Sequence, residues 1–182
     1  MVKKNLENSD LLTRQFFYNL FLFFGALCCC QPILRKSPFN YGFLFLWTLL
    51  ESHLISFIAL RYDISTVCLA MGITAGICLL VSCLVNFTKF DFTKLLPVMM
   101  VVLIVWVFIT LIGRVFLGLM AGSIAYAGIG CTIFVIFLAI DMKLITGGGK
   151  YELGEEDYIF GAIIIYMDII QIFLYVLELL DN

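Results

Sequence analysis

The sequence predicts an all-α membrane protein, a polytopic helical bundle with about six spans. The chain is 63% hydrophobic and only 13% charged over 182 residues, which is more apolar surface than a water-soluble domain of this length can bury. Its apolar stretches reach the length of about 20 residues that is needed to cross a hydrocarbon core of roughly 30 Å. These stretches are unbroken and do not alternate with polar residues, so helices are favoured over the strands of a membrane barrel.

Charge, proline or glycine bounds each apolar stretch. The predicted spans cover about 16–34, 41–60, 64–86, 95–112, 119–141 and 158–180. The first is the weakest, because its apolar run ends at Cys30 and reaches spanning length only through Gln31 and Pro32. Residues 1–15 are polar and contain no apolar core of a signal peptide. The connections are short, so we expect a single transmembrane bundle over 16–180, without a linker or a second domain.

The positions of lysine and arginine predict the orientation, since short cytosolic loops carry the positive excess. The loops on one side contain Arg35, Lys36, Lys89, Lys94, Lys143 and Lys150. The loops on the other side contain Arg61 and Arg114. The first set of loops is therefore predicted to be cytosolic. The basic residues of segment 1–15 then fall on the non-cytosolic side, against the rule, and an absent preceding span would explain this conflict.

Two lone aspartates lie in the last two apolar stretches, Asp141 at the end of 121–140 and Asp168 in the middle of 159–180. An ionisable group at membrane depth costs several kcal/mol unless it faces a partner or a wet cavity. Two carboxyl groups in contact at low dielectric cannot both ionise easily, so they would share a proton and could switch with pH. Antiparallel helices bring both to one depth only if helix continues beyond Asp141 or the last segment dips into the membrane and returns.

Arg35, at the cytosolic end of the first span, has two interpretations. It could supply a counter-charge to the two aspartates, or it could be an interfacial anchor whose charged end reaches the water. The second interpretation is favoured.

The seven cysteines predict neither a disulfide framework nor a metal site, because no CxxC pair and no His/Cys cluster has ligand spacing. The juxtamembrane run Cys28 to Cys30 either carries palmitoyl groups or packs as small apolar side chains. Glu51 and His53 point to different helix faces. Each is either a structural hydrogen-bonding group or a ligand, and the structural role is favoured. The segment 147–150, Gly-Gly-Gly-Lys, lacks the spacing of a phosphate loop and is expected to be a flexible connector. The sequon at Asn86 lies on the predicted cytosolic face and is expected to be unmodified.

Several motifs then carry a resemblance to a known family. They are Arg35-Lys36-Ser37-Pro38-Phe39-Asn40, Thr48-Leu49-Leu50-Glu51-Ser52, Tyr62-Asp63, Thr88-Lys89-Phe90-Asp91-Phe92-Thr93, Glu155-Glu156-Asp157-Tyr158-Ile159-Phe160-Gly161-Ala162 and Tyr166-Met167-Asp168-Ile169-Ile170-Gln171-Ile172-Phe173-Leu174. In this order and spacing, the chain from Phe16 to Leu180 resembles the transmembrane Bax inhibitor motif family, in its lifeguard and Golgi anti-apoptotic branch.

Two features depart from the pattern of that family. Its members usually have seven hydrophobic segments, and the segment that would precede Phe16 is expected to be absent from this chain. They also tend to carry a Tyr-Asp-Thr-Gln-like sequence at the first aspartate, whereas Asp141 is followed here by Met142 and Lys143. The aspartate is kept, and its hydrogen bonding or gating is expected to differ.

The resemblance implies a Bax-inhibitor-type bundle around the final helix, with Asp141 and Asp168 as a pH-sensitive latch on a calcium leak path. It implies a Golgi or endoplasmic reticulum membrane, a lower calcium store and inhibition of apoptosis. Glu156 is implied to line the pore; the acidic run 155–157 could equally cap a helix N-terminus. No cofactor is expected, and calcium would meet Asp141 and Asp168 only in transit. The expected partners are the lipid bilayer, calcium ions and membrane proteins of calcium handling or apoptosis, with no nucleic acid.

Two other functions compete with the channel. A non-conducting protein that binds partners in the same membrane would also be a helical bundle. An intramembrane aspartyl protease also needs two aspartates on adjacent helices, but such enzymes carry Tyr-Asp, Gly-x-Gly-Asp and Pro-Ala-Leu. Here Asp168 follows Tyr166-Met167, and the chain contains no Pro-Ala-Leu. The sequence therefore favours a protein that is not an enzyme.

Overall fold

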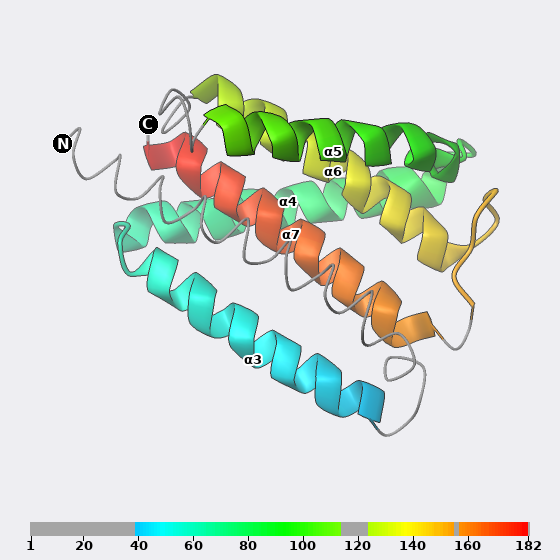
Figure 1. The fold of residues 1–182 in the computed structure, drawn as a ribbon, viewed down its shortest axis with the longest axis horizontal. Helices are drawn as coiled ribbons and strands as arrows, with labels where there is room; N and C mark the ends of the chain where they lie inside the picture. Colours follow the sequence, from blue (N-terminus) through cyan, green and yellow to red (C-terminus); the bar gives the residue numbers. More distant parts are fainter. Residues whose placement is uncertain (1–38, 114–123, 155–156, 182) are drawn as a thin grey trace.

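The structure, a computed structural model, describes residues 39–113, 124–154 and 157–181 (Figure 1). The described helices are α3 (Phe39–Ala59), α4 (Ile64–Phe87), the short 3-10 helix η1 (Phe92–Leu95), α5 (Leu96–Leu111), α6 (Ile124–Thr146) and α7 (Tyr158–Asp181). Within these described residues, five segments are long and apolar enough to cross a membrane, and η1 and α5 together form one of them. The predicted class, a polytopic helical membrane protein, is confirmed. The predicted span 16–34 lies outside the described residues.

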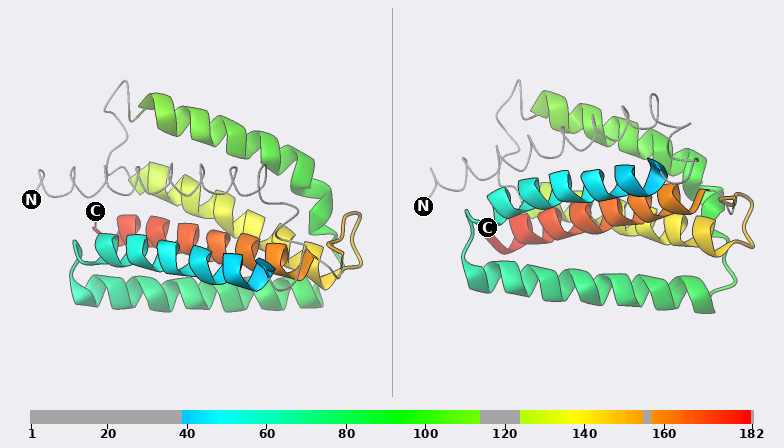
Figure 2. Two further views of the ribbon diagram at one scale, coloured as in Figure 1. Left: turned by 60° about the horizontal axis from the view of Figure 1, so that its bottom comes forward. Right: turned by 90° about the horizontal axis from the view of Figure 1, so that it is seen from below.

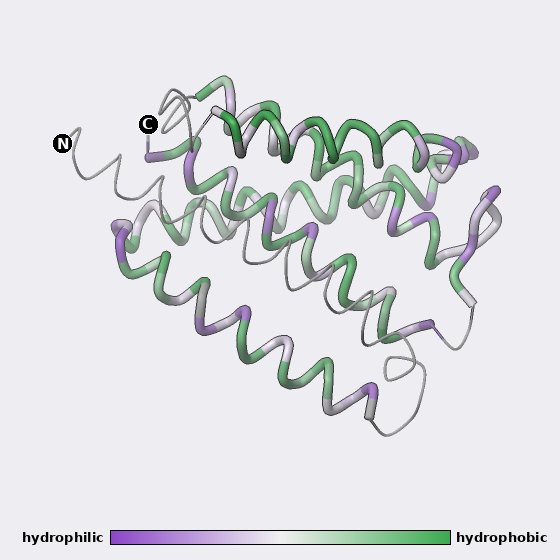
Figure 3. Tube along the Cα trace, in the orientation of Figure 1, coloured by the Kyte–Doolittle hydropathy of each residue, from purple (hydrophilic) through white to green (hydrophobic). Residues whose placement is uncertain are grey.

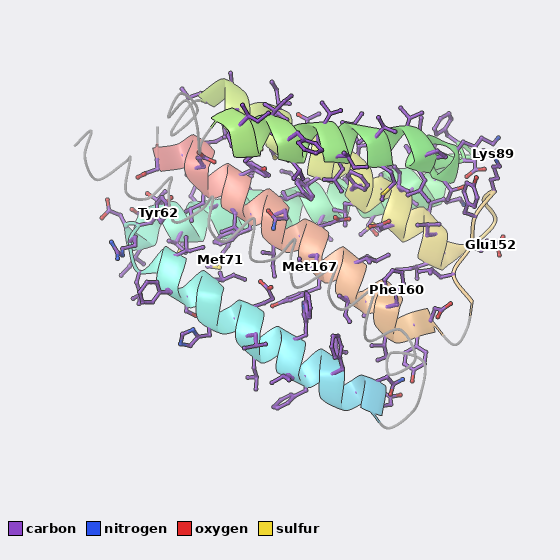
Figure 4. The ribbon with its side chains drawn as sticks, viewed as in Figure 1. Tyr62, Met71, Lys89, Glu152, Phe160 and Met167 are labelled. Atoms are coloured by element: carbon purple, nitrogen blue, oxygen red, sulfur yellow. The ribbon has the colours of Figure 1, made fainter. Side chains whose placement is uncertain are left out.

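Successive helices run in opposite directions, so the connections gather at two ends of the bundle (Figures 1 and 2). Figure 4 places Lys89 and Glu152 at one end and Tyr62 at the other. The first is here called the lysine end, because Lys89, Lys94, Lys143 and Lys150 belong to the helix ends and connections found there. It is the end predicted to face the cytosol.

Helix α7 is the centre of the bundle. In its most apolar window 67% of the residues are buried inside the protein, against 17% for α4. Figure 1 shows α7 between α3 on one side and α5 and α6 on the other, and α4 packs against both α6 and α7. The outer helices expose large apolar side chains such as Phe45, Leu79 and Phe108. In a membrane these faces contact lipid.

Helices α6 and α7 pack closely because small residues lie at both ends of their contact. A Cβ at Gly130 would lie 2.5 Å from ring atoms of Tyr175, and one at Gly161 would lie 3.0 Å from Ile145. Between these points Leu138 and Ile172 are fully buried. Glycine lets the two backbones approach, as is common where membrane helices meet.

Helix α6 continues beyond the first aspartate. The sequence placed the end of this span at Asp141, whereas the helix runs on to Thr146 and ends where Gly147 takes the left-handed conformation at φ 77°. Glycine adopts this conformation without steric cost and commonly follows a helix end. Of the two alternatives for matching the depths of the aspartates, the structure shows continued helix.

The connection after α6 is not the flexible linker that the sequence predicted. The backbone amide of Lys150 donates hydrogen bonds to Asp91 Oδ2 at 2.9 Å and to Thr93 Oγ1 at 3.0 Å. Glu152 accepts a hydrogen bond from the Gly148 amide at 3.1 Å. We call the bonds of Asp91 and Thr93 to this connection the Asp91 clasp. The prediction failed because partners 57 residues away in the chain fix the loop.

Candidate functional site

The candidate site is formed by Asp141 on α6 and Asp168 on α7. The side chains of these aspartates, here the aspartate pair, lie near enough to each other to interact directly. Both are buried, with exposed fractions of 8% and 6%. A hydrogen bond between two carboxyl groups requires a proton on one of them, since an ionised carboxylate only accepts. A pair that shares one proton would therefore join the two central helices by a hydrogen bond.

One oxygen of the pair remains without a partner. Asp168 Oδ2 is buried and has no hydrogen-bond partner among the described residues. Cys78 of α4 lies near enough to Asp168 for the two groups to interact electrostatically. Thr74, one turn earlier on α4, also has a buried hydroxyl without a hydrogen-bond partner among the described residues. Unpaired polar atoms are costly in an apolar interior. Asp168 Oδ2 is therefore an atom at which a water, a proton or a cation would gain a hydrogen bond or an oxygen ligand.

Two of the four predicted site residues lie outside the described part of the chain. These two residues are Arg35 and Glu156, so the proposed counter-charge and pore-lining roles stay predictions. Among the described residues no lysine or arginine pairs with either aspartate. Glu152, in the same connection as Glu156, accepts a hydrogen bond from the Gly148 amide.

The Asp91 clasp lies at the lysine end, outside the membrane-spanning segments. Asp91 Oδ1 accepts hydrogen bonds from the Thr93 hydroxyl at 2.5 Å and from the Thr93 amide at 3.1 Å. Together with the Lys150 amide these bonds hold the pKa of Asp91 below its ordinary value, the hydroxyl of Thr93 contributing most. The clasp is a structural anchor for the connection between α6 and α7.

The cysteines of the described residues form no disulfide with one another, and two polar residues of α3 lie on different faces of that helix. Cys68, Cys78, Cys83 and Cys131 are free. Glu51 is fully buried and has an interaction partner, while His53 is exposed, so the two side chains do occupy different faces. The Ser52 side chain hydrogen-bonds Tyr166 of α7. These contacts join α3 to the central helix.

Three polar residues that follow Asp168 on α7 were not predicted as site residues from the sequence. Gln171, Tyr175 and Glu178 are buried, with exposed fractions of 4% to 5%. Figure 3 shows hydrophilic positions interrupting the hydrophobic trace of α7 along its length. Their spacing from Asp168, three, seven and ten residues, is the signal that could have revealed them, because it places all four on one helix face.

No calcium-binding cage is present among the described residues, where no group of three or more His, Cys, Asp or Glu side chains could hold a metal ion. Calcium takes six to eight oxygen ligands in stable sites. The aspartate pair alone can therefore bind such an ion only weakly.

Long apolar helices around a buried pair of carboxyl groups define a polytopic membrane protein with an ionisable site in its interior. A family model described as "Inhibitor of apoptosis-promoting Bax1" matches residues 6–182. The chain belongs to this Bax inhibitor family, as its motifs predicted.

Relatives within the family agree with the predicted branch. The chain is 38% identical over 159 residues to protein lifeguard 3 of Homo sapiens, covering 86% of this chain and 51% of that protein. It is 36% identical over 160 residues to protein lifeguard 3 of Mus musculus, covering 86% and 52%. It is 27% identical over 147 residues to the Golgi anti-apoptotic protein of Vaccinia virus (strain Lister), covering 81% and 60%. The chain thus spans about half the length of the lifeguard relatives. No solved structure matches it.

Proposed function

We propose that this protein is a pH-sensitive calcium leak pathway of an intracellular membrane, switched by the aspartate pair. The observation that carries the proposal is the close approach of Asp141 and Asp168, both buried between the two central helices. By lowering stored calcium the leak would oppose apoptosis. The family description and the name of the viral relative, a Golgi anti-apoptotic protein, support that role and a Golgi or endoplasmic reticulum membrane.

The chemistry of the pair supports a two-state switch. While one proton is shared, the hydrogen bond holds α6 and α7 together. When both carboxyl groups ionise, two like charges about 4 Å apart repel by about 4 kcal/mol at an effective dielectric constant near 20. An energy of this size shifts a two-state equilibrium by roughly three powers of ten. The leak would therefore rise with pH.

The same chemistry suits a permeating calcium ion. The ionised pair offers hard carboxylate oxygens at a depth where the ion has lost part of its hydration shell. Two carboxylates are too few to retain calcium, so the ion can leave again. Conduction requires a site of this kind, favourable enough to enter and weak enough to leave.

The test is calcium flux into liposomes that contain the purified protein, measured from mildly acidic to mildly alkaline pH. Flux should rise with pH in the native protein. In Asp141→Asn and Asp168→Asn an amide replaces a carboxyl group, the repulsion is lost, and flux should stay at its acidic level. Asp63→Asn is the matched control, because Asp63 is exposed in the connection between α3 and α4. It should behave like the native protein.

A second candidate function is a non-conducting protein that binds partners in the same membrane. It is favoured by the large apolar area on α3, where only 18% of the most apolar window is buried inside the protein. That face could bind another membrane helix as well as lipid. Absence of flux above empty liposomes, from protein shown to be helical by circular dichroism, would exclude the leak and support this alternative.

A further inference from the structure

Helix α7 carries a continuous polar face that extends beyond the aspartate pair. Asp168, Gln171, Tyr175 and Glu178 are separated by three, four and three residues, so they lie on one side of the helix. All four side chains are buried. Ionisable and polar groups inside a membrane bundle are expensive and mark ion or substrate paths by default. Most of the other side chains on α7 are apolar, so this face is a distinct feature of the helix.

Tyr175 stands at the middle of a buried hydrogen-bonded group from three helices. Trp106 Nε1 of α5 donates to Tyr175 Oη at 3.1 Å, and Tyr126 Oη of α6 lies 3.5 Å from the same oxygen. Thr110 Oγ1 lies 3.2 Å from Tyr126 Oη. The rings of Trp106 and Tyr126 stack with centroids 4.9 Å apart. We call Trp106, Thr110, Tyr126 and Tyr175 the Tyr175 cluster.

Gly130 of α6 makes the position of the Tyr175 ring possible. A Cβ there would lie 2.5 Å from Tyr175 Cε1 and Cζ, which no side chain tolerates without displacement. Two residues away, a Cβ at Gly128 would meet no atom within 4 Å. The close approach at Gly130 allows the Tyr175 ring to pass α6 and its hydroxyl to reach Trp106 and Tyr126.

Glu178 lies one helical turn beyond Tyr175, towards the end of the bundle opposite the lysine end. The Glu178 carboxyl group interacts electrostatically with Tyr175, and the Glu178 side chain is only 4% exposed. Ten residues, about 15 Å of helix, separate Glu178 from Asp168. The polar face of α7 thus has an acid at each end and the Tyr175 cluster between them.

We infer that the Tyr175 cluster is a second closure on the leak path, in series with the aspartate pair, and that Glu178 is the acidic site on its far side. This inference rests on the proposed leak function. The cluster joins α5, α6 and α7 at a level where an ion leaving the aspartate pair along the polar face must pass. The carboxylate of Glu178 then supplies an oxygen ligand to the partly dehydrated cation.

A series arrangement makes a specific prediction for flux. Tyr175→Phe keeps the ring and removes the hydroxyl that joins the three helices, so it should raise the flux plateau at alkaline pH several-fold. The acidic baseline and the pH midpoint should not change, because the aspartate pair remains intact. Gly130→Ala should act in the same direction by displacing the ring. Gly128→Ala is the matched control on the same helix and should leave flux unchanged.

Glu178 is tested in the same liposomes. Glu178→Gln should lower the alkaline plateau several-fold without moving the midpoint, and Glu178→Asp, which keeps the carboxylate, should recover much of it. A role in packing alone would not separate Gln from Asp in this way, since Gln is the closer match in shape. Circular dichroism and thermal unfolding of each variant establish that it is folded.

The outcomes separate this inference from the proposed function. Flux that depends on pH and on the aspartate pair, with native plateaus in both Tyr175→Phe and Glu178→Gln, would leave the latch standing and overturn the second closure. A shifted midpoint with an unchanged plateau in Tyr175→Phe would assign Tyr175 to the aspartate latch and also overturn it. No flux from the folded native protein would overturn both proposals.

Discussion

The backbone amide of Lys150 donates a hydrogen bond of 3.0 Å to the hydroxyl of Thr93, a residue 57 positions earlier in the chain. The contact joins the connection after α6 to the turn that starts α5. The Tyr151 amide also approaches the Thr93 hydroxyl, at 3.3 Å. The last turn of α6, and with it the depth of Asp141, is therefore anchored from the lysine end.

Thr93→Val should destabilise the protein. Thr93 is fully buried, and its hydroxyl donates to Asp91 while it accepts from two backbone amides. Removal of the hydroxyl leaves buried polar groups unpaired, at a cost of about 1 to 3 kcal/mol. Unfolding in detergent by heat or denaturant measures the loss. Thr88→Val, at an exposed position, should change stability little, and an equal loss in both variants would show that the clasp is not the cause.

The Asp91 clasp should weaken only in acid. The pKa of Asp91 is lowered in the folded protein, chiefly by the Thr93 hydroxyl. Its stabilising effect is therefore fully present above the ordinary aspartate pKa of about 3.9 and is lost as the pH falls through the lower folded value. Asp91→Asn should remove this part of the acid dependence of the unfolding temperature. If the stabilising effect of Asp91 were lost near neutral pH instead, the lowered pKa of Asp91 would be contradicted. The clasp would then respond in the pH range of the aspartate pair.

Two glycine substitutions should have opposite effects on stability. A Cβ at Gly149 would lie 2.7 Å from Asp91 Oδ1 and 2.8 Å from Thr93 Oγ1, so Gly149→Ala should displace the clasp at a cost of about 1 to 3 kcal/mol. A Cβ at Gly76, within α4, would meet nothing within 4 Å. Gly76→Ala should therefore stabilise the helix by about 0.5 to 1 kcal/mol. Unfolding of both variants under one condition checks the pair, and a stable Gly149→Ala would refute the close approach.

The aspartate pair should show an energetic coupling that depends on pH. A double-mutant cycle with Asp141→Ala and Asp168→Ala isolates their interaction from the burial cost of each group. At mildly acidic pH the shared hydrogen bond should give a favourable coupling of about 0.5 to 3 kcal/mol. At alkaline pH like-charge repulsion should reduce or reverse it. A coupling near zero at every pH would mean that the two carboxyl groups do not interact in the membrane.

Much of the fold could be predicted from the sequence because membrane helices are local objects. Hydropathy and length identified stretches that correspond to α3 through α7, and the two aspartates stood out because ionised groups are rare at that depth. The family motifs predicted the branch that the comparisons show. The helix beyond Asp141 was one of two alternatives, because Met142 and Lys143 do not end a helix and only the following glycines do.

Other features could not be predicted, for a shared physical reason. Lipid tails are as apolar as leucine, so a residue that faces lipid and one that faces another helix look alike in sequence. For this reason the apolar helix faces that pack around α7 could not be predicted, although the spacing of Gln171, Tyr175 and Glu178 from Asp168 signals the polar face itself. The hydrogen bond from the Lys150 amide to the Thr93 hydroxyl was not predicted, because long-range hydrogen bonds leave no periodic pattern in the sequence.

The sequence by itself determined that this chain is a helical membrane protein of the Bax inhibitor family with two acidic groups at membrane depth, because composition, run length and motifs are properties of the chain. Only the tertiary structure decided that Asp141 and Asp168 lie close enough to interact and that Trp106 donates a hydrogen bond to Tyr175. Those contacts depend on how antiparallel helices are aligned, which is set by close packing at Gly130 and Gly161 and by the clasp at Thr93.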